Sequence, residues 1–283
     1  MSASEPGIPA SSEPPTLADA GFVDVAHATV TREQAERVAA CIDAEPTVLD
    51  TGALPLLWHW AAFLPLVPTA ALGPDGHPRR RPEMEAFPQR MWVGGRVRVE
   101  RPLVLDTEAE RASRIVRAEL KEGGSGRFWL VTVGHTVAQQ GELCIEEEQD
   151  LVFREAAAVV PPGPGRDDAP DAAWVEARIA DPVLLFRFSA VTANAHRIHY
   201  DHPYATGVEG YPDLVVHGPL TAVLLAELAR RRGAREWRSV SYRARAPHYA
   251  NRRFWLTGSP TDDGADLAAV RSDHTVAMTL EVR

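Results

Sequence analysis

The chain has 283 residues, of which 45% are hydrophobic, and a formal net charge of −9. This length and apolar content fit a folded globular protein with one large domain or two smaller ones. The acidic balance argues against a nucleic-acid partner, because neutralising phosphates needs clustered Lys and Arg. The apolar runs are shorter than the ~18 residues that span a bilayer, which argues against a membrane protein.

The N-terminal stretch MSASEPGIPASSEPPT is rich in Pro, Ser and Glu, which predicts a disordered tail over residues 1–20. It has neither the basic start nor the apolar core of a signal peptide. Two cysteines, Cys41 and Cys144, are too few for a disulfide or zinc framework. We therefore expect two ordinary thiols and a cytoplasmic protein.

The first predicted helix begins at Thr31, which has capping-box spacing to Gln34. Apolar residues follow at helical intervals: Ala35, Val38, Ala39 and Ile42. A second apolar segment, LPLLWHWAAFLP, is apolar on nearly every face, which predicts a buried central helix over residues 54–64 with Trp58 and Trp60 in the core.

Three strands are predicted next, within residues 114–121, 127–138 and 142–155, joined by the turn sequences EGGSG and QQGE. In the first of them Val116, Ala118 and Leu120 share one face. The acidic run EEEQD, residues 146–150, is expected on a solvated strand edge.

Prolines and glycines crowd the segment VVPPGPGRDDAPDA, which predicts a linker over residues 159–172. It separates a first half, residues 21–158, from a second half, residues 173–283.

The second half repeats the plan of the first. LLFRFSAVT, residues 184–192, is predicted as an apolar strand, and GPLTAVLLAELARRRG as a helix that ends at a glycine stop. Four strands follow, the last with Val276, Met278, Leu280 and Val282 on one side. Each half thus reads as a curled antiparallel sheet around one hydrophobic helix, an α+β arrangement.

The polar cluster NAHRIHYD, residues 194–201, allows three interpretations. His196 and His199 lack the HExxH spacing of zinc proteases, and a third metal ligand cannot be assigned, so we expect no metal. Asn194 and Asp201 could simply satisfy a turn. The third interpretation is thioester chemistry, because Gly218-Pro219 stands at a helix start, where free N–H groups can polarise an acyl carbonyl.

The segment FSAVTANAHRIHYDHPYATGVEGYPDLVVHGPLTAVLL resembles the active-site region of the MaoC-like hydratases and dehydratases, which have the hot-dog fold. In that family a motif S-G-D-x-N-P-L-H supplies an acidic residue and a His five positions later. These positions fall on Asn194 and His199, and the family's HG at the central helix falls on His217 and Gly218. Asn in place of Asp, followed by HRIHYD, is similar to a narrower branch that includes mesaconyl-CoA and itaconyl-CoA hydratases and mitochondrial 3-hydroxyacyl-thioester dehydratases.

The resemblance spans roughly residues 20–283 and implies a double hot dog with one active site in the second half. It implies reversible hydration of an enoyl-CoA, with Asn194 and His199 as catalytic residues and the Gly218 N–H on the thioester carbonyl. His217, Tyr200 and Arg90 are candidate substrate contacts. The substrate would be carried by CoA or acyl carrier protein, with no cofactor, and we expect a homodimer or higher homo-oligomer.

Several alternatives stay open. The acyl group could be short, branched and dicarboxylic, as in the narrower branch, or linear. A hot-dog thioesterase would need a carboxylate where Asn194 stands, and a non-catalytic acyl-CoA binding protein would not need both Asn194 and His199. Arg79, Arg80 and Arg81 could contact CoA phosphates, although a solvated loop is expected, and Tyr204 could line the pocket or pack.

Overall fold

The computed structural model describes residues 23–79, 84–123, 126–155, 159–166, 168–233 and 236–283. The predicted tail, Arg80 and Arg81 lie outside them. The described strands form one ten-stranded antiparallel sheet in the order β1-β3-β4-β5-β2-β7-β10-β9-β8-β6. Their bounds are β1 Val23–Val30, β2 Gln89–Val99, β3 Thr107–Gly123, β4 Gly126–Gln139, β5 Glu142–Arg154, β6 Trp174–Ile179, β7 Ser239–Ala244, β8 Arg253–Pro260, β9 Ala265–Arg271 and β10 Val276–Val282.

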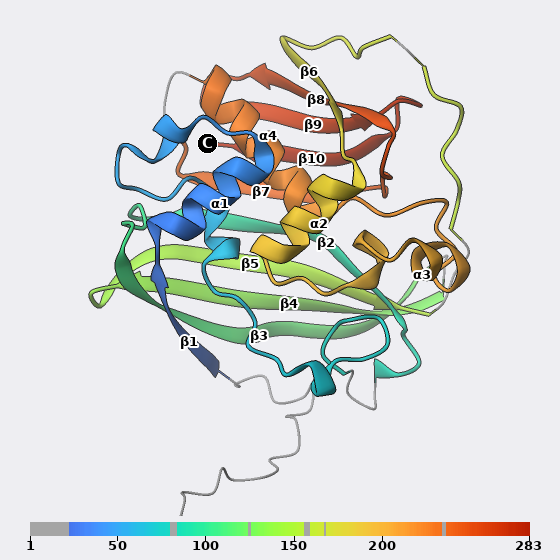
Figure 1. Ribbon diagram of the computed structural model, residues 1–283, viewed down its shortest axis with the longest axis horizontal. Coiled ribbons are helices and arrows are strands. Elements are labelled where there is room, and N and C mark those ends of the chain that lie inside the picture. Colours follow the sequence, from blue (N-terminus) through green and yellow to red (C-terminus); the bar gives the residue numbers. More distant parts are fainter. Residues whose placement is uncertain (1–22, 80–83, 124–125, 156–158, 167, 234–235) are drawn as a thin grey trace, which may run out of the picture.

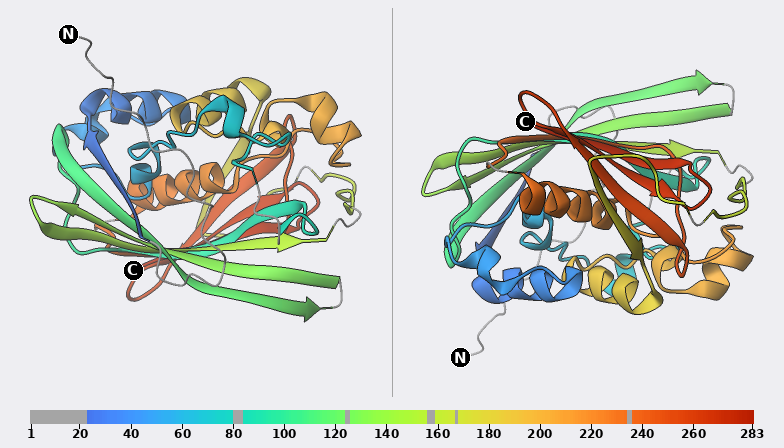
Figure 2. Two further views of the ribbon diagram at one scale, coloured as in Figure 1. Left: turned by 90° about the horizontal axis from the view of Figure 1, so that it is seen from below. Right: turned by 90° about the horizontal axis from the view of Figure 1, so that it is seen from above.

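The helices gather on the concave side of the sheet (Figures 1 and 2). Helix α4 lies directly against the sheet, and helices α1 and α2 form a further layer over it (Figure 2). The bounds are α1 Arg32–Ile42, α2 Pro182–Val191, α3 His202–Gly207 and α4 Gly218–Arg232, with 3₁₀ helices η1 Pro46–Leu49, η2 Trp58–Ala61, η3 Thr69–Ala71 and η5 Arg197–His199. No helix among the described residues is long and apolar enough to cross a bilayer.

The two halves correspond element by element. In the sheet order, β1-β3-β4-β5-β2 is mirrored by β6-β8-β9-β10-β7, and β2 pairs with β7 at the centre. Val97 faces Val240 in the middle of that pairing, so the junction relates the halves by an approximate twofold axis. The described parts of the segment 159–172 contain neither helix nor strand.

Two helix predictions are confirmed. Helix α1 starts where expected, with the Thr31 hydroxyl accepting from the Gln34 N–H at 3.1 Å and the predicted apolar face buried. Helix α4 buries every residue from Leu220 to Ala229, because the sheet surrounds it on one side and α1 and α2 cover the other.

The predicted strand at residues 184–192 is wrong, because most of this segment belongs to helix α2. Asp181 caps the helix by accepting from the Leu184 N–H at 2.8 Å, and Pro182 occupies the first helical position. The apolar run is buried on one side only, at Leu185 and Phe188. The Asp-Pro start signal was present in the sequence and outweighs the strand-like composition.

The long central helix predicted over residues 54–64 is also wrong. The segment contains the four-residue η2 instead, because the backbone that precedes it is held in a non-helical conformation. The Leu54 N–H donates to the Leu103 carbonyl, Pro55 follows, and Leu57 adopts a left-handed φ of 69°. Trp58 is in the core as predicted, whereas Trp60 is half-buried against it.

The three strands predicted in the first half occur as β3, β4 and β5, whereas β1 and β2 were not predicted, and two strand faces differ from expectation. Val116 and Leu120 of β3 are exposed. The acidic run 146–150 lies in β5, which is a central strand between β4 and β2, so it is not a sheet edge. Glu147 within it is buried and points toward η2.

Glu147 is the centre of a buried polar network. Its carboxylate contacts His59 Nε2 at 3.0 Å and accepts from Trp60 Nε1 at 2.7 Å and Gln149 Nε2 at 2.8 Å. Burial alone would raise the pKa of Glu147, but the charge and hydrogen bond of His59, with His135 and Gln149, lower it to about 2. The ionised carboxylate thus fixes η2 to the sheet, and its contribution is lost only as the pH falls below the ~4.3 of an unfolded Glu.

We predict that His59→Ala lowers stability rather than chemistry. It leaves the Glu147 carboxylate buried without its imidazole, which should cost about 3–5 kcal/mol of unfolding free energy in a denaturant titration. His27→Ala is the control, because His27 is exposed beside Glu108 and Glu110 and should change little. A His59→Ala protein of unchanged stability that had lost all turnover would place His59 in the chemistry instead.

Candidate active site

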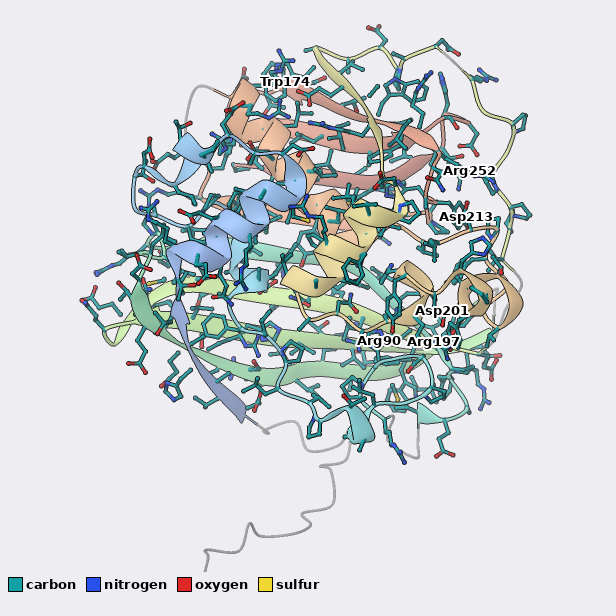
Figure 3. All side chains as sticks on the ribbon, in the orientation of Figure 1. Arg90, Trp174, Arg197, Asp201, Asp213 and Arg252 are labelled. Atoms are coloured by element: carbon teal, nitrogen blue, oxygen red, sulfur yellow. The ribbon has the colours of Figure 1, made fainter. Side chains whose placement is uncertain are left out.

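The loop after α2 is shaped by its backbone. The Thr192 hydroxyl donates to the Phe188 carbonyl, Ala193 takes a positive φ of 48°, and the Asn194 N–H returns to the Ser189 carbonyl at 2.8 Å. This closes the helix and turns the chain toward η5. The loop is then held by Arg197, whose guanidinium pairs with Asp201 at the start of α3 (Figure 3).

His199 is buried with a fixed tautomer. Its Nδ1 lies 2.7 Å from the Val215 carbonyl oxygen, which can only accept, so Nδ1 carries the proton and Nε2 has the lone pair. Burial lowers the pKa of His199 to about 4, although the Val215 hydrogen bond opposes this. The imidazole is therefore neutral at ordinary pH, and Nε2 is a base.

Asn194 is also oriented by the backbone. Its Oδ1 accepts from the His196 N–H at 3.0 Å, so the amide NH₂ is the group left to interact with another molecule. Asn194 thus offers donors at this loop.

His217 joins the loop to α4. Its ring stacks on His199 with the centroids 3.7 Å apart, and its Nε2 lies 2.9 Å from Ser189 Oγ. Burial lowers the pKa of His217 well below its ordinary value, helped by the nearby His199 and His196. His217 is the residue before α4, so His199 lies beside the first turn of that helix.

The first turn of α4 presents backbone N–H groups. No side chain caps it, Pro219 has no N–H, and the Thr221 N–H donates to the His217 carbonyl. The N–H groups of Gly218 and Leu220 therefore lack intrahelical acceptors, and the helix dipole adds partial positive charge there. Together with the neutral His199 Nε2, this arrangement can take a proton and stabilise an oxyanion side by side.

The first half of the fold also reaches this loop. The hairpin Gly73–His77 packs on it so closely that a Cβ at Gly76 would lie 1.8 Å from the Ala195 carbonyl oxygen. The His77 ring lies 4.2 Å from that of His196, which in turn contacts His199. Arg90 of β2 donates to His77 Nδ1 at 3.1 Å.

Most of the predicted site residues lie near the start of α4, and the two tyrosines make separate contacts. His199, His217 and Gly218 come together at the start of α4, and Asn194 is connected to His217 through Ser189. Arg90 is connected to His199 through two imidazoles. Tyr200 is 45% exposed and its hydroxyl donates to the Ala195 carbonyl, so its ring and the acceptor lone pairs of its oxygen are left for other contacts. Tyr204 is buried, its hydroxyl donates to Glu209, and its ring lies under Arg197.

Sequence reasoning missed the supporting residues. Ser189, Val215 and His77 gave no chemical signal of their own, because their roles depend on contacts across the fold. Gly76 and Trp92 lie in the stretches DGHP and RMWVGG, which contain no chemical motif.

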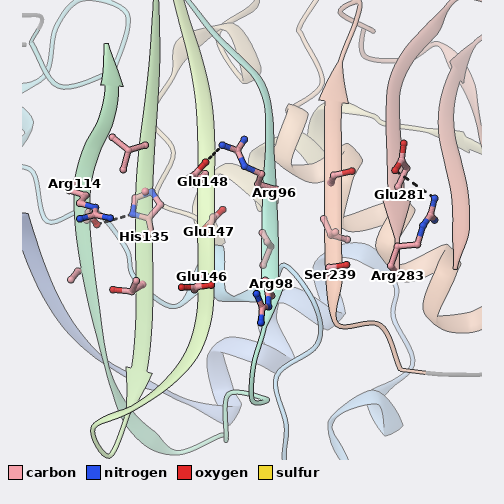
Figure 4. A pocket seen from close by; sticks show the side chains of 18 residues that line it. Arg96, Arg98, Arg114, His135, Glu146, Glu147, Glu148, Ser239, Glu281 and Arg283 are labelled. Carbon is pink, nitrogen blue, oxygen red and sulfur yellow. Dashed lines mark hydrogen bonds and ion pairs between the residues drawn. The ribbon is translucent and has the colours of Figure 1, made fainter. Parts of the chain in front are cut away.

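A separate groove of about 660 Å³ lies on the opposite face of the sheet (Figure 4). Arg96, Arg98, Glu146 and Glu148 line it. Glu147 also borders it, but its carboxylate contacts His59 and Trp60 on the other side of the sheet. Arg96 pairs with Glu148, and Arg98 pairs with Glu100. This groove contains none of the residues around His199.

The two sheets joined at β2 and β7, with helix α4 on their concave side, form a double hot-dog fold. A family model for hydroxyacyl-thioester dehydratase type 2 matches residues 57–250. The chain therefore belongs to this family, and it is a hydro-lyase with a double hot-dog fold.

Two curated relatives match most of the chain. Mesaconyl-C(4)-CoA hydratase of Chloroflexus aurantiacus is 45% identical over 257 residues, which cover 88% of this chain and 91% of the relative. The mitochondrial hydroxyacyl-thioester dehydratase type 2 of Schizosaccharomyces pombe is 27% identical over 254 residues, covering 78% and 82%.

Solved structures agree in fold at low identity. A MaoC-like dehydratase from Phytophthora capsici has a TM-score of 0.68 at 13% identity, covering 92% of this chain and 94% of that chain. A Mycobacterium tuberculosis protein described as a double hotdog fold has a TM-score of 0.53 at 14% identity, covering 95% and 97%.

Proposed function

We propose that this protein catalyses the reversible hydration of an enoyl-CoA with a short, branched, dicarboxylic acyl group of the mesaconyl or itaconyl type. The observation that carries the proposal is the His199 tautomer: its Val215 hydrogen bond leaves Nε2 unprotonated beside the first turn of α4. The curated relative named as a mesaconyl-C(4)-CoA hydratase supports the acyl group.

In hydration, His199 Nε2 takes one proton from a water molecule as the water oxygen bonds to C3. The double-bond electrons move to the thioester carbonyl, whose developing oxyanion is stabilised by the Gly218 N–H and the α4 dipole. The enolate then collapses and takes a proton at C2 from the His199 imidazolium. Each step is reversed in dehydration.

The Asn194 amide cannot accept a proton, so its role is to position the attacking water. With Oδ1 held by the His196 N–H, its NH₂ would donate to the oxygen of the attacking water, or of the leaving hydroxyl in reverse. His199 is then the one group that titrates in the reaction.

The other proposed residues surround this centre. His217 supports the His199 ring, Tyr200 contacts the substrate with its exposed ring, and Arg90 binds the acyl carboxylate. We assign residues 21–158 to a first hot dog that completes the pocket and residues 173–283 to a second that carries the catalytic pair. We also propose that the protein is a homodimer or higher homo-oligomer in the cytoplasm. The similarity to a CoA-thioester hydratase supports CoA as the carrier of the acyl group.

Two rival functions, a thioesterase and an acyl-CoA binding protein, can be distinguished by what happens to the substrate. A thioesterase would release free thiol and would need a carboxylate at the catalytic centre. Within the described residues, the hydrogen bond of His199 is to the Val215 carbonyl and its ring contacts are to two imidazoles, and none of these partners is a carboxylate. An acyl-CoA binding protein would leave the substrate unchanged. Incubation with mesaconyl-CoA and crotonyl-CoA, followed by enoyl absorbance and thiol release, separates the three.

We predict that His199→Ala lowers kcat by about 10²–10⁴, the usual contribution of a positioned general base. Asn194→Ala should also slow turnover, with a smaller change in KM. Steady-state hydration rates on mesaconyl-CoA test this, with circular dichroism as the folding control. Near-normal turnover by His199→Ala would place the base elsewhere.

The pH dependence provides a second prediction. Because the free base is required and burial lowers the pKa of His199 to about 4, kcat/KM should stay level from neutral pH and fall through one ionisation near that value. In Asn194→Asp an added carboxylate favours the imidazolium, so the acid limb should move to higher pH while partial activity remains. Identical pH profiles for the two proteins would contradict the assigned pair.

The role of Arg90 can be tested by comparing substrates. Arg90→Met should reduce kcat/KM for mesaconyl-CoA by about 10²-fold, because a charged hydrogen bond to the acyl carboxylate is lost, and should affect crotonyl-CoA much less. Arg114→Met is the control, since Arg114 lines the groove on the opposite face. An equal loss on both substrates would assign Arg90 to another part of the ligand or to structure.

A further inference from the structure

The β2 sequence RMWVGG, residues 90–95, contains a β-bulge. Trp92 pairs with Leu151 of β5, but the next pairing is Gly94 with Asp150, so Val93 is an extra residue on β2. Bulges bend a strand and change the direction of neighbouring side chains. Here the bulge comes directly after Trp92.

Trp92 lies on the first residue of α4. A Cβ placed on Gly218 would be 2.6 Å from Trp92 Cε3 and 3.0 Å from Cζ3, so the benzene edge of the indole touches the Gly218 backbone. The contact explains why this position is glycine, since any larger side chain would displace the ring. An indole from the first half of the fold therefore lies beside the N–H proposed to bind the thioester carbonyl.

The Trp92 ring is held on two sides by aromatic contacts. Tyr242 of β7 stacks on it with centroids 4.5 Å apart and an interplanar angle of 16°, and Trp60 meets it edge-on at 5.7 Å. Gly95 makes room for Tyr242, because a Cβ there would lie 2.3 Å from the Tyr242 hydroxyl. Trp60 is anchored in turn by its hydrogen bond to Glu147.

The aromatic cluster of Trp60, Trp92 and Tyr242 is only partly buried. Tyr242 is 4% exposed, whereas Trp60 and Trp92 are half-buried. Helix α4 occupies the concave face of the second half, while the corresponding segment of the first half is the short η2. Part of the surface of Trp60 and of Trp92, which touches Gly218, is therefore accessible, and the contacts with Tyr242 and Trp60 hold the Trp92 ring in place.

We propose that Trp92 is a specificity-determining residue that limits the length of the acyl group. The proposal rests on the proposed function, because it takes the thioester carbonyl to lie at Gly218. An acyl chain that leaves the carbonyl meets the Trp92 and Trp60 rings, which accommodate a short, flat enoyl group and obstruct a longer chain.

The test compares Trp92→Ala with Trp174→Ala. Trp174 is a matched control, because its Cε3 also lies 2.6 Å from the Cβ position of a glycine, Gly258. It belongs to edge strand β6, far from Arg90 and Arg197 in Figure 3. Binding of butyryl-CoA and octanoyl-CoA is measured by titration calorimetry, and hydration of crotonyl-CoA and 2-octenoyl-CoA by absorbance.

In Trp92→Ala the ratio of the octanoyl-CoA to the butyryl-CoA dissociation constant should fall by about tenfold, the scale on which pocket size discriminates chain length. Trp174→Ala should leave the ratio unchanged, and Trp92→Leu should give an intermediate shift if the alanine variant does not fold. An equal weakening of both ligands, or an unchanged ratio in both Trp92 variants, would overturn the proposal. Because saturated ligands are not hydrated, a shifted ratio without any hydration would reject the proposed function and retain the role of Trp92.

Discussion

The pairing of β2 with β7 is the constraint on which this site depends. From Gly94–Arg243 to Arg98–Ser239, the two strands join two five-stranded sheets into one. The pairing places the first half of the fold against the N-terminus of α4. Arg90, Trp92 and the hairpin at Gly76 reach the catalytic loop because of this junction, although the catalytic residues themselves belong to the second half.

Burial keeps the histidines around the site neutral. His199, His217 and His248 are all buried, and desolvation lowers the pKa of each, so the imidazoles are neutral and cannot repel one another. Hydrogen bonds then decide which nitrogen carries the proton. The Thr221 hydroxyl donates to the His217 carbonyl and so accepts from His248 Nε2, which fixes the first turn of α4 from behind. A neutral base and an N–H-lined helix start can therefore coexist at short range.

Much of this arrangement was predictable from the sequence, and the failures have identifiable causes. The loop from Asn194 to His199 and the helix at Gly218 carried a motif, and α1 and α4 carried caps or a continuous apolar core signal. The short apolar run at Leu185 fits a strand and a helix equally well, and the segment is a helix because Asp181 caps its N-terminus. The segment at Trp58 did not become a long helix, because its neighbours are tied to the backbone at Leu103.

Contacts that join distant segments could not be predicted in this way. Glu147 lies in a run of charged residues, which predicts a solvated side chain. It is buried instead, because it contacts His59, 88 residues earlier in the chain. The approach of Trp92 to Gly218 depends on a bulge, and the tautomer of His199 depends on the direction of one carbonyl. Such features follow from the three-dimensional pairing of the strands and loops rather than from any local pattern.

The central claim is that His199 is a neutral base with its proton on Nδ1. Heteronuclear NMR of protein labelled with ¹⁵N-histidine, with His199 assigned by comparison with His199→Gln, reports the protonation of each ring nitrogen directly. The account predicts a protonated Nδ1, an unprotonated Nε2 and no titration until the pH approaches about 4. A proton on Nε2 at neutral pH, or a pKa near the ~6.5 of an unperturbed histidine, would contradict it.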